Sequence, residues 1–169
     1  MRLKGKIAIV TGAGSGIGHA TAALFAREGA CVLVADLVGE RAKGVASDIQ
    51  ELGGAAEAFV GDVSSEKDAE QMAARADKLW NRLDILVNNA ASFHHRTAEE
   101  ATKDDWERVL SVNVMGTSAH YETAEGRRHR KPCLDQRAGC HADRLDDLQR
   151  QQGSHRQHVQ VDGHGPCAV

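Results

Sequence analysis

Along residues 1–110, short apolar runs take turns with segments of helical apolar spacing. This pattern predicts a strand followed by a helix, four times in succession. Short apolar runs typical of buried parallel strands occupy residues 7–10, 31–35, 58–60 and 83–87. A segment with a helical spacing of apolar residues follows each run. This order favours right-handed βαβ units and a parallel sheet with helices on both faces.

Glycines set the expected ends of the first two helices. Gly29 is expected to end the first helix, and Gly53 follows a second helix that is expected to run from about Glu40 to Leu52. The expected apolar face of the first helix comprises Ile17, Ala20, Thr21, Leu24 and Phe25.

Capping residues set the expected starts of the other two helices. Ser65 with Asp68 is expected to open the third helix, and Thr102 with Asp105 the fourth. The apolar face expected for the third helix comprises Ala69, Met72, Ala73, Ala76, Leu79 and Trp80. The apolar face expected for the fourth comprises Trp106, Val109 and Leu110.

The composition changes abruptly near residue 120. Residues 121–169 contain both prolines of the chain and no Ile, Phe, Met or Trp. Such a segment buries little apolar area to offset the roughly 1–2 kcal/mol of backbone entropy that each ordered residue loses. We therefore expect one folded domain over residues 1–120 and a disordered tail over residues 121–169.

Charge and hydropathy argue against several classes of partner. A formal net charge of −3 gives no general attraction to nucleic acid or to anionic membranes. No apolar run reaches the roughly 20 residues that a membrane span needs. The first residues lack the features of a signal peptide, so a cytoplasmic location is expected.

The tail offers two weak chemical signals. Its basic run at residues 127–131 has no interleaved aromatic residues, which indicates a solvated charge run rather than a nucleic-acid site. Its histidines and cysteines match no standard zinc spacing, so no metal site is expected. The candidate ligands in the tail are Cys133, Cys140, His141, His155 and His158.

The turn between the first strand and the first helix carries a stronger signal. Residues 11–18 read T-G-x-x-x-G-x-G, with Ile17 where a G-x-G-x-x-G pattern would hold its last glycine. A helix N-terminus presents unpaired N–H groups and a positive dipole end, which attract a pyrophosphate. Glycines let the backbone approach that anion. The alternative is a glycine-rich turn that binds nothing.

Asp36 favours a dinucleotide ligand for this loop. It ends the second strand, about 20 residues beyond the loop, where a carboxylate accepts hydrogen bonds from the adenosine ribose hydroxyls. The same charge repels the 2′-phosphate of NADP, so NAD is the expected cofactor. The alternative is an exposed Asp that caps the next helix.

Four motifs, in this order and at these spacings, resemble those of the short-chain dehydrogenases/reductases. They are the loop at residues 11–18, Gly61-Asp62-Val63, Asn88-Asn89-Ala90 and Asn113. The glycine usual after Asn-Asn-Ala is replaced by Ala91. The resemblance covers about residues 1–120 and implies an α/β fold. The expected architecture is a Rossmann-like doubly wound parallel sheet of strand order 3-2-1-4, incomplete beyond the fourth strand.

The resemblance also implies roles for single residues. The residue matching Asp62 reaches the adenine amino group, and the one matching Asn89 lies beside the cofactor and steadies the central strand. The residue matching Asn113 belongs to the catalytic relay. In the sequence pattern Asn113 falls on an apolar helix face, where the alternative is an amide bonded to neighbouring backbone. The expected cofactor-binding residues are Gly12, Ser15, Gly16, Ile17, Gly18, Asp36, Leu37, Asp62, Val63, Asn89 and Ala90.

The remaining catalytic residues that the resemblance implies are missing from the sequence. The family uses a Tyr as general acid/base, a Lys four residues later, and a Ser upstream that bonds the substrate oxygen. Tyr121 is the only tyrosine, and Glu125 stands four residues after it. Asn113 is therefore the only expected catalytic residue, and the chain is expected to be inactive.

A reading-frame slip accounts for both the missing motif and the change of composition. Codons for residues 148–153, read one nucleotide later, can encode Tyr-[Ser/Asn]-Ala-[Ser/Asn]-Lys. Codons for residues 128–137 can likewise encode a strand-like segment that contains a serine. The two motifs follow in the family's order, which places the slip between about residues 119 and 127.

The sequence thus predicts part of an oxidoreductase that transfers hydride between NAD and a small alcohol or ketone. The alternatives are a non-catalytic dinucleotide-binding module and an unstable frameshift product without function. The parent enzyme is expected to be a homo-oligomer. This chain is expected to be aggregation-prone, because its fourth strand would remain an unpaired edge.

Overall fold

The computed structural model describes residues 1–93, 97 and 99–118. Its strands are β1 (Ile7–Thr11), β2 (Cys31–Asp36), β3 (Ala55–Val60) and β4 (Ile85–Val87). Its helices are α1 (Gly16–Arg27), α2 (Gly39–Glu51), α3 (Glu66–Trp80) and α4 (Lys103–Leu110), which continues into a π-helical turn, η1 (Ser111–Met115). Every prediction made for residues 121–169 lies outside the described residues.

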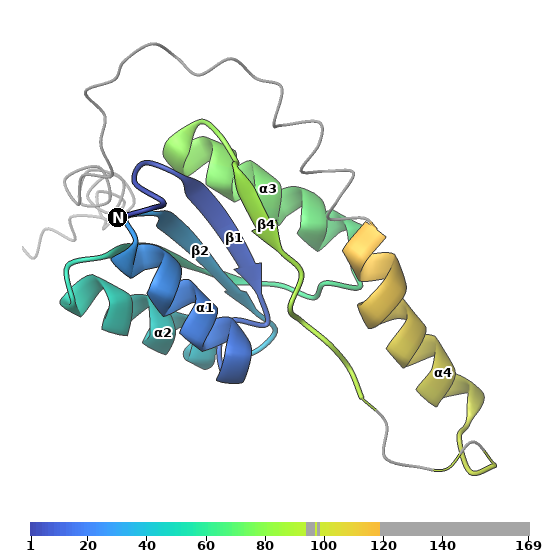
Figure 1. Ribbon diagram of the computed structural model, residues 1–169. Helices are drawn as coiled ribbons and strands as arrows, with labels where there is room; N and C mark the ends of the chain where they lie inside the picture. The colour runs from blue at the N-terminus through green and yellow to red at the C-terminus, as the bar shows by residue number, and fades with distance from the viewer. Residues whose placement is uncertain (94–96, 98, 119–169) are drawn as a thin grey trace, which may run out of the picture.

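The four strands form one parallel sheet in the order β3-β2-β1-β4. The predicted α/β, Rossmann-like sheet of order 3-2-1-4 is therefore confirmed for the described residues. Helices α1 and α2 cover one face of this sheet, and α3 covers the other (Figure 1). Within the described part of the chain, no helix is long and apolar enough to cross a bilayer.

Alternate side chains of the central strands fill two cores. Val10, Val32 and Val34 pack with the buried residues of α1 and α2 on one face. Ile9 and Leu33 pack on the other face with residues of α3 such as Met72 and Leu79. Because side chains alternate along a strand, the successive apolar residues of β1 up to Val10 and of β2 up to Ala35 supply both cores.

Helix α1 buries a different face from the one predicted. Its buried residues are Gly18, Ala22 and Ala26, whereas Ile17 is 79% exposed and Leu24 is 41% exposed. These small residues let α1 pack closely on the sheet, and Ile17 instead lines a cleft at the end of β1. The spacing of the large apolar residues therefore predicts the wrong buried face for α1.

The predicted glycine ends of α1 and α2 are confirmed. Gly29 and Gly53 have φ values of 90° and 79°, in the left-handed region that glycine adopts readily. At the end of α1 the Gly29 N–H donates to the Ala26 carbonyl at 2.9 Å, and the Ala30 N–H donates to the Phe25 carbonyl at 3.0 Å. This pair of bonds is a Schellman motif.

The predicted caps of α3 and α4 are confirmed as well. The Ser65 hydroxyl accepts a hydrogen bond from the Asp68 N–H at 3.3 Å. Thr102 and Asp105 form a complete capping box. The predicted face of α3 is buried from Ala69 to Leu79, and Trp80 is partly buried beside it.

The predicted apolar face of α4 is not buried. Trp106 and Leu110 are 55% and 49% exposed, and none of the α4 residues is fully buried. Helix α4 projects away from the sheet (Figure 1), so no described element covers this face. Apolar spacing identified the helix correctly, but the packing partner that the spacing implies is absent from the described residues.

Strands β3 and β4 differ in extent from the prediction. Strand β3 begins three residues earlier, at Ala55, because its first residues pair in register with β2 from Cys31 onward. Strand β4 begins at Ile85 rather than at Leu83. Just before it, the Asp84 carboxylate accepts the Ile7 N–H at 2.8 Å and so takes a position that a strand carbonyl would occupy.

Candidate functional site

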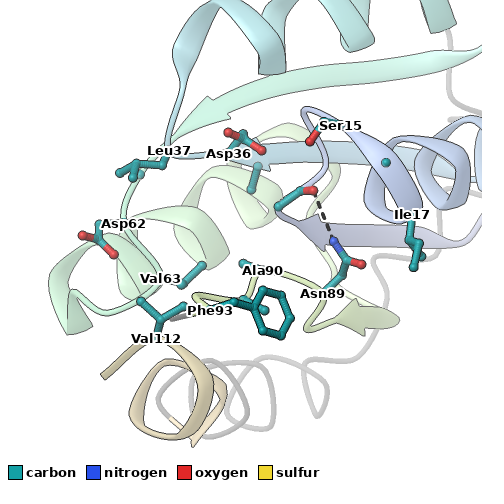
Figure 2. A pocket seen from close by; sticks show the side chains of 15 residues that line it. Ser15, Ile17, Asp36, Leu37, Asp62, Val63, Asn89, Ala90, Phe93 and Val112 are labelled. Carbon is teal, nitrogen blue, oxygen red and sulfur yellow. Dashed lines mark hydrogen bonds between the residues drawn. The ribbon is translucent and has the colours of Figure 1, made fainter. Parts of the chain in front are cut away.

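A cleft of about 440 Å³ opens at the carboxyl ends of the four strands (Figure 2). In parallel α/β sheets this edge is the usual place for a ligand. The cleft is lined by Gly12, Ser15, Gly16, Ile17, Ala35, Asp36, Leu37, Gly61, Asp62, Val63, Asn89, Ala90, Ala91, Phe93 and Val112.

The structure brings together the predicted cofactor-binding residues at this cleft, with one exception. Gly18 lies beneath the loop rather than on the lining. Asn113, predicted as a catalytic residue, is also absent from the lining, although its neighbour Val112 contributes to it. In the described ranges, no group of three or more His, Cys, Asp or Glu side chains is arranged to hold a metal ion.

The three glycines that define the T-G-x-x-x-G-x-G motif, Gly12, Gly16 and Gly18, have different physical roles. At Gly18 an added Cβ would lie 2.3 Å from the Gly12 carbonyl oxygen, and at Gly12 it would lie 2.8 Å from the Ala90 Cα. Gly12 and Gly18 are therefore needed for close packing of the loop. Gly16 has a φ of 54°, and an added Cβ there would meet open space at the cleft. Its bare backbone leaves room for a ligand to approach the start of α1.

The Asp36 carboxylate is fixed at the edge of the cleft by two backbone donors. Its Oδ2 accepts the Gly14 N–H and its Oδ1 accepts the Val38 N–H, each at 2.9 Å. Val38 is the N-cap of α2, and its N–H is the one that Asp36 binds, so the carboxylate meets the start of the helix and the edge of the cleft at once. An ionised carboxylate accepts about four hydrogen bonds, which leaves capacity for two ligand hydroxyls.

Thr11 and Asn89 join the glycine loop to the end of β4. The Asn89 amide donates to the carbonyls of Thr11 and Gly12 at 3.0 and 3.2 Å, and Figure 2 shows the second of these bonds. The buried Thr11 hydroxyl accepts the N–H groups of Asn89 and Ala90 and donates to the Val87 carbonyl. These bonds fix the glycine loop relative to the segment after β4, and both segments line the cleft.

Asp62 lies across the cleft, in the segment after β3 (Figure 2). Its Oδ1 accepts the Ser64 N–H at 2.9 Å and the Ser64 hydroxyl at 2.7 Å. The Asp62 N–H donates to the Asp68 carboxylate at 2.8 Å. An added Cβ at Gly116 would lie 2.6 Å from the Val63 carbonyl oxygen, so the end of η1 packs tightly against this segment.

Asn113 binds neighbouring backbone. Its Oδ1 accepts the Ser92 N–H at 2.8 Å, and its Nδ2 donates to the Ser92 carbonyl at 2.9 Å. This reciprocal pair anchors the segment after β4 to η1. The partly buried amide therefore finds its partners as the alternative proposed, in backbone rather than in the cleft.

Sequence reasoning missed several residues of the site. Thr11 is the first residue of the loop motif, so its position in the pattern already carried a signal. Val112 directly precedes the predicted Asn113, whereas Phe93 lies three residues after the predicted Ala90, in a segment without a periodic pattern. Figure 2 shows both at the end of the cleft opposite Asp36, and Phe93 is 79% exposed.

The family model described as short chain dehydrogenase matches residues 6–124. The chain belongs to the short-chain dehydrogenase family. Among similar curated proteins is an uncharacterized oxidoreductase of Thermotoga maritima, 41% identical over 116 residues that make up 69% of this chain and 45% of that protein.

Solved structures of other short-chain dehydrogenases are similar to the described domain. A 7α-hydroxysteroid dehydrogenase complexed with NADH and 7-oxo glycochenodeoxycholic acid has a TM-score of 0.72 and 36% identity, covering 75% of this chain and 49% of that one. A short chain dehydrogenase from Burkholderia cenocepacia J2315 in complex with NADP has a TM-score of 0.73 and 35% identity, covering 76% and 53%. This chain thus spans about half the length of such relatives.

Proposed function

We propose that this chain carries the NAD-binding part of an oxidoreductase that acts on a CH–OH or C=O group. The observation that carries the proposal is the Asp36 carboxylate, held by two backbone N–H groups beside a glycine loop whose Gly16 opens on the cleft. NAD, when bound, supplies the hydride acceptor. The residues of this chain hold the adenosine and nicotinamide nucleotides of the bound NAD in position.

Each part of the cleft suits one part of the cofactor. The start of α1, with Ser15 and Gly16, offers N–H groups and a positive dipole end to the pyrophosphate. Asp36 accepts hydrogen bonds from the adenosine ribose, and Asp62 accepts one from the adenine amino group. The end of the cleft near Asn89 then receives the nicotinamide side.

The same residues favour NAD over NADP. A dianionic 2′-phosphate would meet the Asp36 charge at the ribose, whereas a 2′-hydroxyl can donate a hydrogen bond to it. Similar solved structures hold either NADH or NADP, so the preference depends on particular residues rather than on the fold.

We further propose that the 169-residue chain is not an active enzyme. Residues 1–169 contain no Tyr-x-x-x-Lys motif, and Asn113 is engaged with backbone. The reading-frame slip explains this loss. The parent enzyme would be a cytoplasmic homo-oligomer acting on a small alcohol or ketone, and the exposed apolar residues of α4 favour aggregation of this chain.

Replacing Asp36 by alanine is expected to remove the preference for NAD. Wild-type chain should bind NAD at least about tenfold more tightly than NADP, which corresponds to about 1.4 kcal/mol. In Asp36→Ala the charge repulsion disappears and the NAD affinity also falls, because two ribose hydrogen bonds are lost. Isothermal titration of both cofactors measures the two affinities.

Asp48→Ala is the matched control, because Asp48 is an exposed carboxylate on α2 and does not line the cleft. It should bind both cofactors as the wild type does. Equal or tighter binding of NADP by the wild-type chain would contradict the proposed preference for NAD. If the folded wild-type chain bound neither NAD nor NADP, the proposed function would be wrong.

A further inference from the structure

Asp62 has one carboxylate oxygen left for a ligand, because its other polar groups already have partners. Its N–H donates to the Asp68 carboxylate at 2.8 Å, and its carbonyl accepts the Ser65 N–H at 3.0 Å. Its Oδ1 accepts both the N–H and the hydroxyl of Ser64, at 2.9 and 2.7 Å. In the part of the chain that the structure describes, Oδ2 accepts no hydrogen bond. Asp62 lines the cleft (Figure 2), so Oδ2 is the acceptor it offers there.

The backbone next to Asp62 is held on both sides. The Gly61 N–H donates to the Asp36 carbonyl at 3.2 Å, which ties this segment to the end of β2. An added Cβ at Gly61 would lie 2.6 Å from the Phe59 ring and 3.4 Å from the Asp68 Cβ, so Gly61 is packed between these side chains. The orientation of the Asp62 carboxylate therefore depends on Ser64 rather than on movement of the backbone.

The Ser64 hydroxyl is not explained by the start of α3. The N-cap of that helix is the next residue, Ser65, whose hydroxyl accepts the Asp68 N–H at 3.3 Å. Ser64 is exposed, and its hydroxyl donates to Asp62 instead. The side chain of Ser64 thus acts on a carboxylate of the cleft and not on the helix.

We propose that Ser64 is a positioning residue that fixes which oxygen of Asp62 faces the ligand, and that it thereby makes the site select a 6-aminopurine over a 6-oxopurine. This inference rests on the proposed function, in which Asp62 accepts a hydrogen bond from the adenine amino group. With both Ser64 donors on Oδ1, the remaining oxygen accepts from an amino group. A 6-oxo group would instead set an acceptor against an acceptor.

Discrimination between the two purines requires that the carboxylate be held. A 6-oxopurine carries an N1–H donor next to its oxo group, and a carboxylate that is free to turn can reach this donor. Loss of the Ser64 hydroxyl therefore weakens the rejection of the 6-oxopurine more than it weakens binding of the 6-aminopurine.

The same contact orients an amide at position 62. The Ser64 N–H can only donate, so in Asp62→Asn it keeps the amide oxygen on its own side. The amide NH₂ group then takes the place of Oδ2 and faces the cleft as a donor. Such a donor suits a 6-oxo group, so the preference between the purines reverses.

The test uses NAD and nicotinamide hypoxanthine dinucleotide, which carries a 6-oxo group in place of the 6-amino group. Isothermal titration into the full chain gives the ratio of their affinities. The wild type should bind NAD about tenfold more tightly, and Ser64→Ala should reduce this ratio to about threefold or less. Ser64→Thr keeps the hydroxyl and should restore the wild-type ratio.

Two amide variants test the orientation itself. Asp62→Asn should bind the hypoxanthine dinucleotide at least about threefold more tightly than NAD. In Asp62→Asn/Ser64→Ala the amide is held by one donor instead of two, so this reversal should shrink. An equal reversal with and without the Ser64 hydroxyl would contradict its positioning role.

Ser47→Ala is the matched control. Ser47 is an exposed serine of α2 whose hydroxyl also donates to a carboxylate, that of Glu51 at 3.5 Å, and it does not line the cleft. This variant should keep the wild-type ratio. Melting curves show that each variant is folded.

The outcomes distinguish this inference from the proposed function. If the wild type binds NAD but Ser64→Ala keeps the full ratio, the role of Ser64 is wrong and the proposed function stands. The same holds if the wild type binds both dinucleotides equally. If the folded wild type binds neither dinucleotide, both the inference and the proposed function are wrong.

Discussion

Gly18→Ala is expected to destabilise the folded domain strongly. The new Cβ would lie 2.3 Å from the Gly12 carbonyl oxygen and 2.6 Å from the Asn89 side-chain nitrogen, and the first of these is backbone that cannot rotate away. Overpacking of this kind typically costs about 1–3 kcal/mol, which lowers a melting temperature by roughly 5–15 °C in a domain of this size. Thermal unfolding followed by circular dichroism measures the loss.

Gly44→Ala provides the matched control. Gly44 lies inside α2, and an added Cβ there meets nothing within 4 Å. Because alanine favours a helix interior over glycine by about 0.5–1 kcal/mol, this variant should melt at a slightly higher temperature than the wild type. A Gly18→Ala protein that melts like the wild type would show that the close packing of the loop is described wrongly.

The 169-residue chain is expected to show no alcohol dehydrogenase activity. The proton transfer that accompanies hydride transfer lacks its Tyr and Lys, and general acid–base catalysis alone contributes about 10²–10⁴-fold to a rate. The Asn113 amide does not titrate at neutral pH, and its two ends already bind the Ser92 backbone. A screen of secondary alcohols with NAD, followed by NADH absorbance, should remain at background.

A chain with the restored reading frame is the positive control for this assay. A change of the encoding DNA near the codons for residues 119–127 should yield a chain with a serine-bearing strand and Tyr-x-x-x-Lys, and this chain should oxidise some secondary alcohol. Turnover by the present chain that Asn113→Ala abolishes would contradict the expected inactivity. A corrected frame without Tyr-x-x-x-Lys would contradict the frame-slip explanation.

Much of the fold was predictable because its signals are local. The ends of α1 and α2 follow from glycines in the left-handed region, and the start of α4 from a complete capping box. Strand order followed from the resemblance and from continuous apolar runs, which favour strands buried on both faces. The elements that differ, β3 and β4, are the outer strands, where pairing to one neighbour decides how far the strand extends.

Features that depend on tertiary packing were less predictable. Ile17 looks like a core residue by spacing, but the close approach of α1 to the sheet at Gly18 turns it toward the cleft. Phe93 and Val112 join the cleft because Asn113 binds Ser92 and fixes the segment after β4 against η1. No periodicity encodes such a contact between distant segments.

NAD binding at the glycine loop is tested by comparing one glycine of that loop with one glycine outside it. Gly16 and Gly53 both have positive φ values, 54° and 79°, and an added Cβ at either meets no other atom within 4 Å. Alanine therefore introduces similar backbone strain at both positions, but only Gly16 lines the cleft.

Isothermal titration of NAD into the wild type, Gly16→Ala and Gly53→Ala is the decisive measurement. We predict one saturable site in the wild type, unchanged affinity in Gly53→Ala, and at least about a tenfold loss in Gly16→Ala, where the methyl group occupies the path of the pyrophosphate. Equal affinities in all three folded proteins, or no binding by the wild type, would contradict the assignment of this cleft to NAD.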